Sequence, residues 1–261
     1  MNLFTACIIY IILCVLLVTQ WETTLDKETF MEKDASTLLV IAHPDDETMF
    51  FGPALINLAT VKSSKTFVLC LTSGNYDGLG TIRRLELLEA MKEIGLPVKN
   101  VFITDHFIDG MNQHWNLTMI AMVVSEKVTE NNVSEVITFD EYGISGHPNH
   151  KDTNGFIKIF LSNMNPSVKF MTLESVNIFR KYLSFLEAPI SLIDWTLRKF
   201  LTETCNQSNA KCQKKVFIGI EPSKYLKLLD SLYRHQSQMV WFRRLYSLFS
   251  RYMFINTLIE C

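Results

Sequence analysis

Short, almost continuously apolar runs recur along the chain and alternate with longer segments in which apolar residues return every three or four positions. Such runs are typical of parallel strands buried on both faces, and the longer segments predict helices that cover the sheet. The alternation therefore predicts an α/β fold with a Rossmann-like, doubly wound and mostly parallel sheet. The expected strands are 38–42, 66–74, 101–104, 135–140, 169–175 and 215–220, and the expected helices include 81–94, 117–128, a helix from 151, 179–200 and a C-terminal stretch over 223–256.

The first 21 residues contain no charged side chain, and Leu3 to Val18 is almost entirely apolar. This length is close to the roughly 20 residues that span a bilayer. A cleaved signal peptide is disfavoured, because no Lys or Arg precedes the run and no small-x-small cleavage pattern follows it. We therefore expect one transmembrane anchor at 1–21, a polar tether at 22–35 and a single domain at 36–261.

The C-terminal helical pattern is interrupted at residues 235–238. If the chain is helical from Met239 onward, one face of that helix is apolar and the other carries Arg and Ser side chains. Such a helix either lies in a membrane interface or packs on its own domain, and packing is the more frequent use. The expected apolar face consists of Met239, Phe242, Leu245, Tyr246, Phe249, Tyr252 and Met253.

Composition, motifs and cysteine spacing argue against a nucleic-acid partner, a nucleotide cofactor and a disulfide-rich fold. The chain has 25 basic and 27 acidic residues, and this balance gives no reason to expect nucleic acid as a partner. A dinucleotide site needs GxGxxG directly after the first strand, where this chain has HPDD, so no nucleotide cofactor is expected. The six Cys residues form no disulfide framework, and only Cys205 and Cys212 are plausible partners.

Candidate chemistry begins at the end of the first expected strand, where His43, Asp45 and Asp46 interrupt the apolar pattern in TLLVIAHPDDETMFFG. Ligands of open α/β sheets bind beyond the carboxyl ends of the strands. An imidazole and one carboxylate make up half of a catalytic zinc site, and the second carboxylate is then free to act as a base. The alternative is that these acids only cap the N-terminus of a helix.

A second His pair, His147 and His150, follows the expected strand 135–140 in the segment EVITFDEYGISGHPNHKD. Because the carboxyl ends of parallel strands meet at one edge of a sheet, these imidazoles can converge on the first site. Two His clusters at two strand ends favour a metal site over a helix cap. The remaining histidines are expected to be packed or solvated, as lone histidines usually are: His106, His114 and His235.

The AHPDDE segment together with the later GHPNH resembles the LmbE-like group of zinc-dependent de-N-acetylases. The chain is more closely similar to the eukaryotic family of N-acetylglucosaminyl-phosphatidylinositol de-N-acetylases of GPI-anchor synthesis. This closer likeness runs from about Thr37 to Asn256. It is carried by LVIAHPDDETMFF, SGNYDG, TFDEYGISGHPNH, LESVNIFRKYLS and HQSQMVWFRRLYSLFSRYMFIN.

The resemblance implies a Zn²⁺-dependent hydrolase that removes the acetyl group from the membrane glycolipid N-acetylglucosaminyl-phosphatidylinositol, the second step of GPI-anchor synthesis. With it we assign His43, Asp46 and His150 as metal ligands and Asp45 as the general base. His147 is assigned as the group that faces the oxyanion or the leaving nitrogen. The division of roles between Asp45 and Asp46 comes from the family motif, because spacing alone cannot make it.

Three further residues are assigned to substrate binding. Arg83 lies at the start of the helix that follows a Gly-rich loop, which is a reasonable cradle for a phosphodiester. A solvated face of Arg residues is an equally good interpretation. Asn75 belongs to the same Gly-rich loop, and Asp109 belongs to the irregular loop after 101–104.

The resemblance also implies the membrane of the endoplasmic reticulum, with the catalytic domain at 36–261 on the cytoplasmic side. Lys27 and Lys33, which follow the expected anchor, lean the same way. Against this stand three sequons, which are glycosylated only in the lumen, at Asn116, Asn132 and Asn206. Two other functions stay open: a deacetylase of a soluble N-acetylglucosaminyl conjugate, and a catalytically silent membrane scaffold with the same fold.

Overall fold

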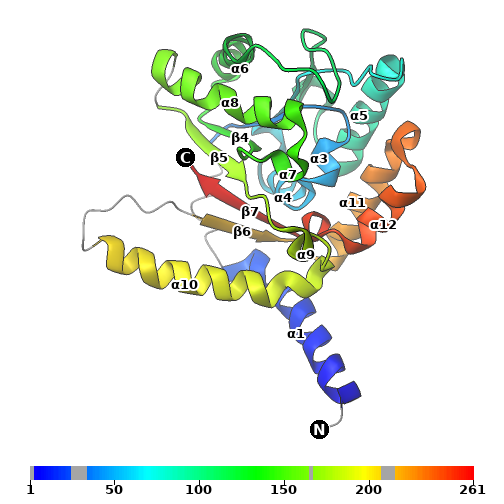
Figure 1. Ribbon diagram of the computed structural model, residues 1–261, viewed down its shortest axis with the longest axis vertical. Coiled ribbons are helices and arrows are strands. Elements are labelled where there is room, and N and C mark those ends of the chain that lie inside the picture. Colours follow the sequence, from blue (N-terminus) through cyan, green and yellow to red (C-terminus); the bar gives the residue numbers. More distant parts are fainter. Residues whose placement is uncertain (1–2, 25–33, 165–166, 207–214) are drawn as a thin grey trace.

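The computed structural model describes residues 3–24, 34–164, 167–206 and 215–261, and its centre is a seven-stranded sheet between helices (Figure 1). The strand order is β3-β2-β1-β4-β5-β7-β6. The strands are β1 (Thr37–Ile41), β2 (Thr66–Cys70), β3 (Val101–Ile103), β4 (Glu135–Phe139), β5 (Lys169–Leu173), β6 (Lys215–Gly219) and β7 (Ile255–Glu260). The helices are α1 (Leu3–Thr24), α3 (Asp46–Met49), α4 (Gly52–Lys62), α5 (Gly80–Ile94), α6 (Leu117–Glu130), α7 (Gly143–Gly146), α8 (Pro148–Asn163), α9 (Ile178–Lys181), α10 (Ala188–Asn206), α11 (Pro222–Arg234) and α12 (Trp241–Phe249).

The first five strands are parallel, which confirms the expected doubly wound sheet. β1 lies between β2 and β4, so that Thr37 is opposite Thr66 on one side and Glu135 on the other. The chain winds outward from β1 to β3 and then returns to start again at β4. The boundary between β1 and β4 is therefore the switch point, where ligands of such sheets bind.

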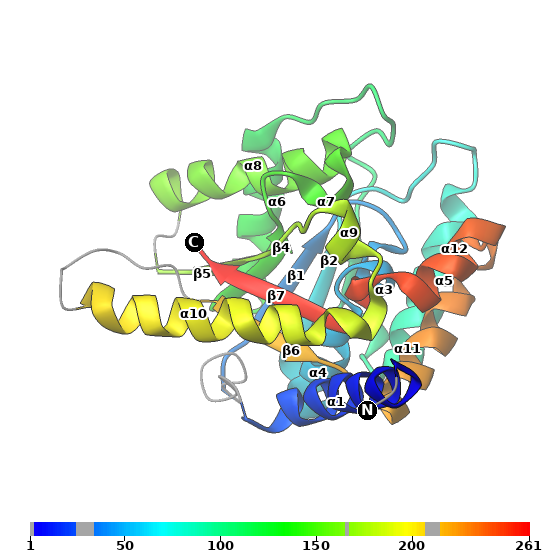
Figure 2. The same ribbon diagram turned by 60° about the horizontal axis from the view of Figure 1, so that its bottom comes forward.

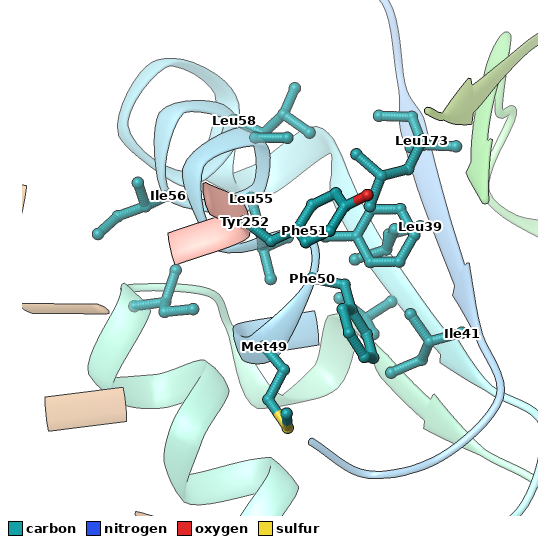
Figure 3. Packing of buried hydrophobic residues seen from close by; sticks show 14 of the residues in the cluster. Leu39, Ile41, Met49, Phe50, Phe51, Leu55, Ile56, Leu58, Leu173 and Tyr252 are labelled. Atoms are coloured by element: carbon teal, nitrogen blue, oxygen red, sulfur yellow. The ribbon is translucent and has the colours of Figure 1, made fainter. Parts of the chain in front are cut away.

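Strand β1 is buried at every position, and its residues 38–41 are all apolar, because both of its faces are covered. Leu38 and Val40 pack with α6 and α8, whereas Leu39 and Ile41 pack with α4, α5 and α11. Figure 3 shows Leu39 and Ile41 within the second of these clusters, next to aromatic side chains that follow the acidic motif. The two-sided burial explains why the strand lacks the apolar–polar alternation of a half-exposed one.

The C-terminal region differs from the expected long helix. It is divided into α11, a short 3₁₀ turn at Gln236–Gln238, α12 and a last strand, β7, which pairs antiparallel with both β5 and β6. The expected break at 235–238 is confirmed, but the expectation of helix beyond Phe249 was wrong. Ser250 has extended backbone (φ −73°, ψ 129°), which ends α12.

Of the two uses expected for the apolar face of the C-terminal helix, packing on the domain is wrong for most of its side chains. Tyr246 is buried, but Phe242, Leu245 and Phe249 are exposed by 54%, 47% and 53%. Tyr252 and Met253 lie beyond the end of α12, in the core. The helical register therefore does not extend through the whole stretch, and α12 turns most of its large apolar side chains away from the domain.

Helix α1 lies on the side of the sheet formed by β6 and β7, near α10 (Figure 2). Its Val18 packs with Ala188, Phe217 and Ile255, and the hydroxyl of Tyr10 donates to the carbonyl of Leu186 at 3.0 Å. Among the helices that the structure describes, none combines the length and the apolar character needed to cross a membrane. The predicted transmembrane anchor at 1–21 is therefore not confirmed.

Two other expectations fall partly outside the described residues. Most of the expected tether at 22–35 lies in 25–33, which is not described. Cys212 also lies outside the described residues, so the pairing of Cys205 with Cys212 stays a prediction.

Candidate metal centre and its surroundings

The carboxylate of Asp46 is held by the turn that ends β1. Its Oδ2 atom accepts hydrogen bonds from the backbone N–H groups of Ala42 and His43, at 3.1 and 2.8 Å. This leaves Oδ1 directed at His150 Nε2, 3.3 Å away. Asp46 is fully buried and begins helix α3.

His150 comes from the other side of the switch point, on the first turn of α8. Its Nδ1 lies 3.0 Å from the carbonyl of Gly143, which leaves Nε2 free to face Asp46 and His43. Gly143 has a left-handed backbone (φ +66°), and a Cβ there would lie 2.6 Å from the Cβ of His150. Glycine at this position thus lets the loop approach close enough to fix the imidazole.

His43 completes the cluster at the end of β1. Its Nδ1 lies 3.3 Å from His150 Nε2 and 3.6 Å from Asp46 Oδ2. Its Nε2 lies 3.1 Å from both Asp109 Oδ1 and Asn149 Oδ1. A ligating His usually donates its second N–H to a carboxylate or carbonyl, and His43 has this arrangement.

The donor set fits a divalent metal ion. His43, Asp46 and His150 are all buried, and each offers one ligand atom, all within 4.8 Å of one another. Each side chain is anchored through its other polar atom, so its inward atom is already oriented. Two imidazoles and one carboxylate are a known ligand set of catalytic zinc sites, which keep a further position open.

The electrostatics of the site favour a cation. Burial lowers the pKa of His43, but hydrogen bonds and charges from Asp109 and Asp46 outweigh burial and raise that pKa to about 10. Burial raises the pKa of Asp46, yet the charges and hydrogen bonds of His150 and His43 hold it well below its usual value. A site that stabilises an ionised carboxylate and a positive charge at this position also suits a metal ion.

His147 lies beside the cluster, with its ring centroid 4.9 Å from that of His43. Burial, together with the charges of His43 and His150, lowers the pKa of His147 to about 4. The backbone N–H of Asn149 donates to His147 Nδ1 at 3.2 Å. The neutral ring therefore carries its proton on Nε2, where it can donate a hydrogen bond.

A second possible metal group overlaps the first and consists of His43, Asp109 and His147. We favour the first group, because Asp109 and His147 are only partly buried and His43 Nε2 already bonds Asp109. Burial raises the pKa of Asp109, but the hydrogen bond with His43 outweighs it and the pKa is lowered. Asp109 is thus placed to orient His43, beside the substrate-binding role predicted from the sequence.

Asp45, the expected base, faces the same cavity of about 210 Å³ as His43, His147 and His150. The guanidinium of Arg243, from α12, donates to its carboxylate, and the guanidinium of Arg83 lies 3.7 Å away. Arg243 was not expected at the site. Its only signal in the sequence was the group of Arg residues in HQSQMVWFRRLYSLFSRYMFIN. The sequence did not indicate which of these Arg side chains would point toward the site.

Arg83 and Asn75 both organise the Gly-rich loop. Arg83 is buried and donates to the carbonyls of Gly74 and Pro44, each at 2.9 Å. Asn75 is exposed, and its Oδ1 accepts from the N–H of Gly80 at 2.9 Å. Asn75 and Asp109 also line a cavity of about 540 Å³ next to the metal cluster, whereas Arg83 lines the smaller one. Their substrate-binding roles stay predictions.

The three other histidines separate into two environments. His106 and His114 are exposed, as expected for solvated side chains. His235 is fully buried, so it is packed as expected, but its partner is an acid: Nε2 lies 2.5 Å from Glu47 Oε1.

The fold matches that of solved deacetylases. A deacetylase triple mutant involved in teicoplanin biosynthesis superposes with a TM-score of 0.59 at 14% identity, covering 87% of this chain and 97% of that one. At this identity the match shows the fold alone. The fold and the site together define the class: an α/β protein with a metal-type His–Asp–His centre at the switch point of its sheet.

Sequence comparison then narrows this class. The family model described as GlcNAc-PI de-N-acetylase (PIG-L) matches residues 38–160. The N-acetylglucosaminyl-phosphatidylinositol de-N-acetylase of Bos taurus is 38% identical, over 85% of this chain and 82% of that protein. The probable enzyme of that name from Schizosaccharomyces pombe is 39% identical, over 85% of this chain and 86% of that protein. The chain belongs to the GlcNAc-PI de-N-acetylase family.

Proposed function

We propose that this protein hydrolyses the acetamide of N-acetylglucosaminyl-phosphatidylinositol, with acetate and the free amine as products. The family and the names of its relatives support this substrate. The observation that carries the proposal is the convergence of the His43–Asp46–His150 cluster, Asp45 and His147 on one cavity. Such a cavity brings together a metal-type site, a carboxylate base and a hydrogen-bond donor.

We propose Zn²⁺ as the bound ion, held by His43 Nδ1, Asp46 Oδ1 and His150 Nε2. A divalent ion at this position would polarise the acetamide carbonyl and lower the pKa of the attacking water.

The protein side chains supply the proton transfers. Asp45 accepts a proton from the water as its oxygen attacks the carbonyl carbon of the acetamide. His147 donates a hydrogen bond from Nε2 either to the oxyanion, which gains negative charge, or to the leaving nitrogen, which must gain a proton. The C–N bond then breaks as Asp45 returns to the nitrogen the proton taken from water, which gives the amine and acetic acid, and the acid loses its proton to become acetate.

The glycolipid has acyl chains that stay in a membrane, so the cavity must lie near a lipid surface. Helix α12 supports this arrangement, because its Arg243 reaches the cavity while Trp241 and Leu248 are exposed by 74% and 55%. Amphipathic helices of this kind bind membrane interfaces, and a Trp side chain suits the boundary region. Exposed apolar side chains of α1, such as Phe4 and Ile12, can add to the contact.

For location we propose the endoplasmic reticulum membrane with the domain on the cytoplasmic side, a proposal that rests on the resemblance. Asn116 and Asn132 are exposed and accessible to a lumenal transferase. We therefore expect no glycan at either residue in protein made in a eukaryotic host. A glycosidase-sensitive loss of mass would place the domain in the lumen.

The test of the proposed function is a mass assay on purified protein with synthetic N-acetylglucosaminyl-phosphatidylinositol and with a soluble N-acetylglucosaminyl conjugate. We expect release of acetate from the glycolipid and much slower release from the soluble compound. Faster reaction with the soluble conjugate would support a different deacetylase. A zinc-loaded, folded protein that cleaves neither compound would favour the silent scaffold.

A further inference from the structure

Two buried side chains behind the cavity, Glu47 and His235, form a pair that the proposed reaction does not use directly. Both residues are fully buried. Glu47 Oε1 lies 2.5 Å from His235 Nε2, and Glu47 Oε2 accepts a hydrogen bond from the backbone N–H of Asp45 at 2.9 Å. The pair is thus hydrogen-bonded to the backbone of Asp45, the residue assigned as the general base.

The backbone of Asp45 needs such a restraint. Asp45 has φ 116°, in the left-handed region that residues with a side chain seldom occupy. Such a conformation typically costs on the order of 1–3 kcal/mol and persists only where surrounding contacts determine it. The Asp45 carbonyl accepts from Met49 N and Thr48 Oγ1, at 2.9 and 3.0 Å, so the Glu47 bond holds the opposite end of the residue.

We propose that Glu47 and His235 are positioning residues that hold Asp45 at the angle needed for proton abstraction. The inference rests on the proposed function. Glu47 fixes the Asp45 amide, and His235 fixes the Glu47 carboxylate, which would otherwise be a buried charge with one bonded oxygen. Asp45 and Asp46 then point different ways from one turn: Asp46 to the metal ligands, and Asp45 to the cavity.

The position of His235 in the fold supports this role. It directly follows α11, which packs against α4 and α5, so its imidazole is supplied by a firmly packed part of the domain. His235 Nδ1 is buried and has no hydrogen-bond partner among the described residues. Among the described residues, Glu47 is therefore the only side chain that hydrogen-bonds the His235 ring. The structure records no hydrogen bond between this ring and the three proposed metal ligands.

The inference is tested with Glu47→Ala, Glu47→Gln and His235→Ala, assayed for kcat, KM, zinc content and thermal unfolding. A misplacement of about 1 Å can cost roughly 10²-fold in rate, so we expect kcat of both Ala variants to fall by this order. KM and zinc content should stay as in the wild type. Glu47→Gln should recover most of kcat, because its amide oxygen still accepts from Asp45 N–H and its NH₂ can donate to a neutral His235.

The matched control is Glu187→Gln. Glu187 is a fully buried acid paired with Arg251 at 2.8 Å, away from the cavity, so its change should lower stability and spare kcat. If Glu47→Ala does not fold, His235→Gln is compared with His235→Ala, because only the Gln amide can donate to Glu47. An unchanged kcat in the Ala variants, equal kcat in the two His235 variants, or a kcat loss that follows zinc loss would overturn the inference. An inactive wild type would instead overturn the proposed function.

Discussion

At the scale of single residues, the site depends on side chains whose two polar ends do different work. His43, Asp46 and His150 each use one atom to bond the protein and turn the other toward a common point. The carboxylate of Asp45 is paired differently, with the guanidinium groups of Arg243 and Arg83 instead of the proposed metal ligands. Neighbouring acids in one motif therefore have separable functions.

We predict that Asp45→Asn keeps its metal and loses turnover, whereas Asp46→Ala loses both. Loss of a general base typically costs ~10² to 10⁴ in rate, and the Asn side chain preserves the shape of the Asp. Removal of Asp46 deletes a ligand and also the acceptor for Ala42 N–H and His43 N–H. Zinc content and acetate release are measured on the same preparations. The assignment fails if Asp45→Asn loses its zinc while Asp46→Ala keeps it.

A second prediction separates the two histidines of the GHPNH segment. His150→Ala should lose the metal, because Nε2 of His150 lies within the ligand cluster. His147→Ala should keep the metal and lose about 10² to 10³ in kcat, the usual cost of one oxyanion donor. The low pKa of His147 means that this donor acts as a neutral ring at neutral pH. Exchanged phenotypes, seen by metal analysis, would reverse the two roles.

Which residues could be predicted follows from how far apart the partners lie in the sequence. His43, Asp45 and Asp46 follow one strand, and His147 and His150 follow another. The local pattern of each motif, and the rule that parallel strands end at one edge of the sheet, were therefore enough to predict that these residues share a site. Glu47 and His235 are 188 positions apart, and Asp45 and Arg243 are 198 apart. A contact between such distant segments depends on how α11 and α12 pack, which no local periodicity contains.

At the scale of secondary structure elements, α12 faces in two directions. Tyr246 and Ser247 are buried, and Arg243 reaches the cavity, whereas Trp241, Leu248 and their neighbours face outward. The sequence predicted an amphipathic helix and left open whether its apolar face meets a membrane or the domain. Periodicity locates the apolar face of a helix but does not show what covers that face. In α12 the buried side contains both apolar and polar residues, Tyr246 and Ser247 among them.

We predict that the double change Trp241→Ser and Leu248→Ser weakens binding to vesicles of phosphatidylcholine and phosphatidylinositol. The expected cause is loss of apolar area from the membrane-facing side of α12, and co-sedimentation measures it. Deacetylation of a water-soluble short-chain analogue should be unchanged. Met119→Ser with Met122→Ser, on the exposed side of α6, is the matched control. Equal vesicle binding by both double variants and the wild type would count against α12 as the lipid-facing element.

At the scale of the whole molecule, the last strand ties the sheet to the acidic turn. β7 lies between β5 and β6, and its Asn256 is fully buried. Asn256 donates to the carbonyl of Phe50 at 2.7 Å and accepts from the N–H of Ala54 at 3.0 Å. Sequence periodicity predicted the parallel sheet but missed β7, because the first two residues of this strand, Ile255 and Asn256, were assigned to the expected helical stretch over 223–256.

We predict that Asn256→Leu lowers the free energy of unfolding by several kcal/mol, because each buried polar group left without a partner costs about 1–3 kcal/mol. Urea unfolding followed by circular dichroism measures the loss. Asn116→Ala should cost less, since its exposed side chain only caps α6. Stability equal to wild type in Asn256→Leu would show that the strand does not support the turn in this way.

The central claim, a metal-dependent deacetylation at the His43–Asp46–His150 cluster, is tested most directly by titrating metal-stripped protein with zinc while acetate release is followed. We predict no release from N-acetylglucosaminyl-phosphatidylinositol without metal, and a rate that rises linearly to about one ion per chain, as one three-ligand site requires. Asp46→Ala should show no such rise. Full activity in protein verified to be free of metal would contradict the account.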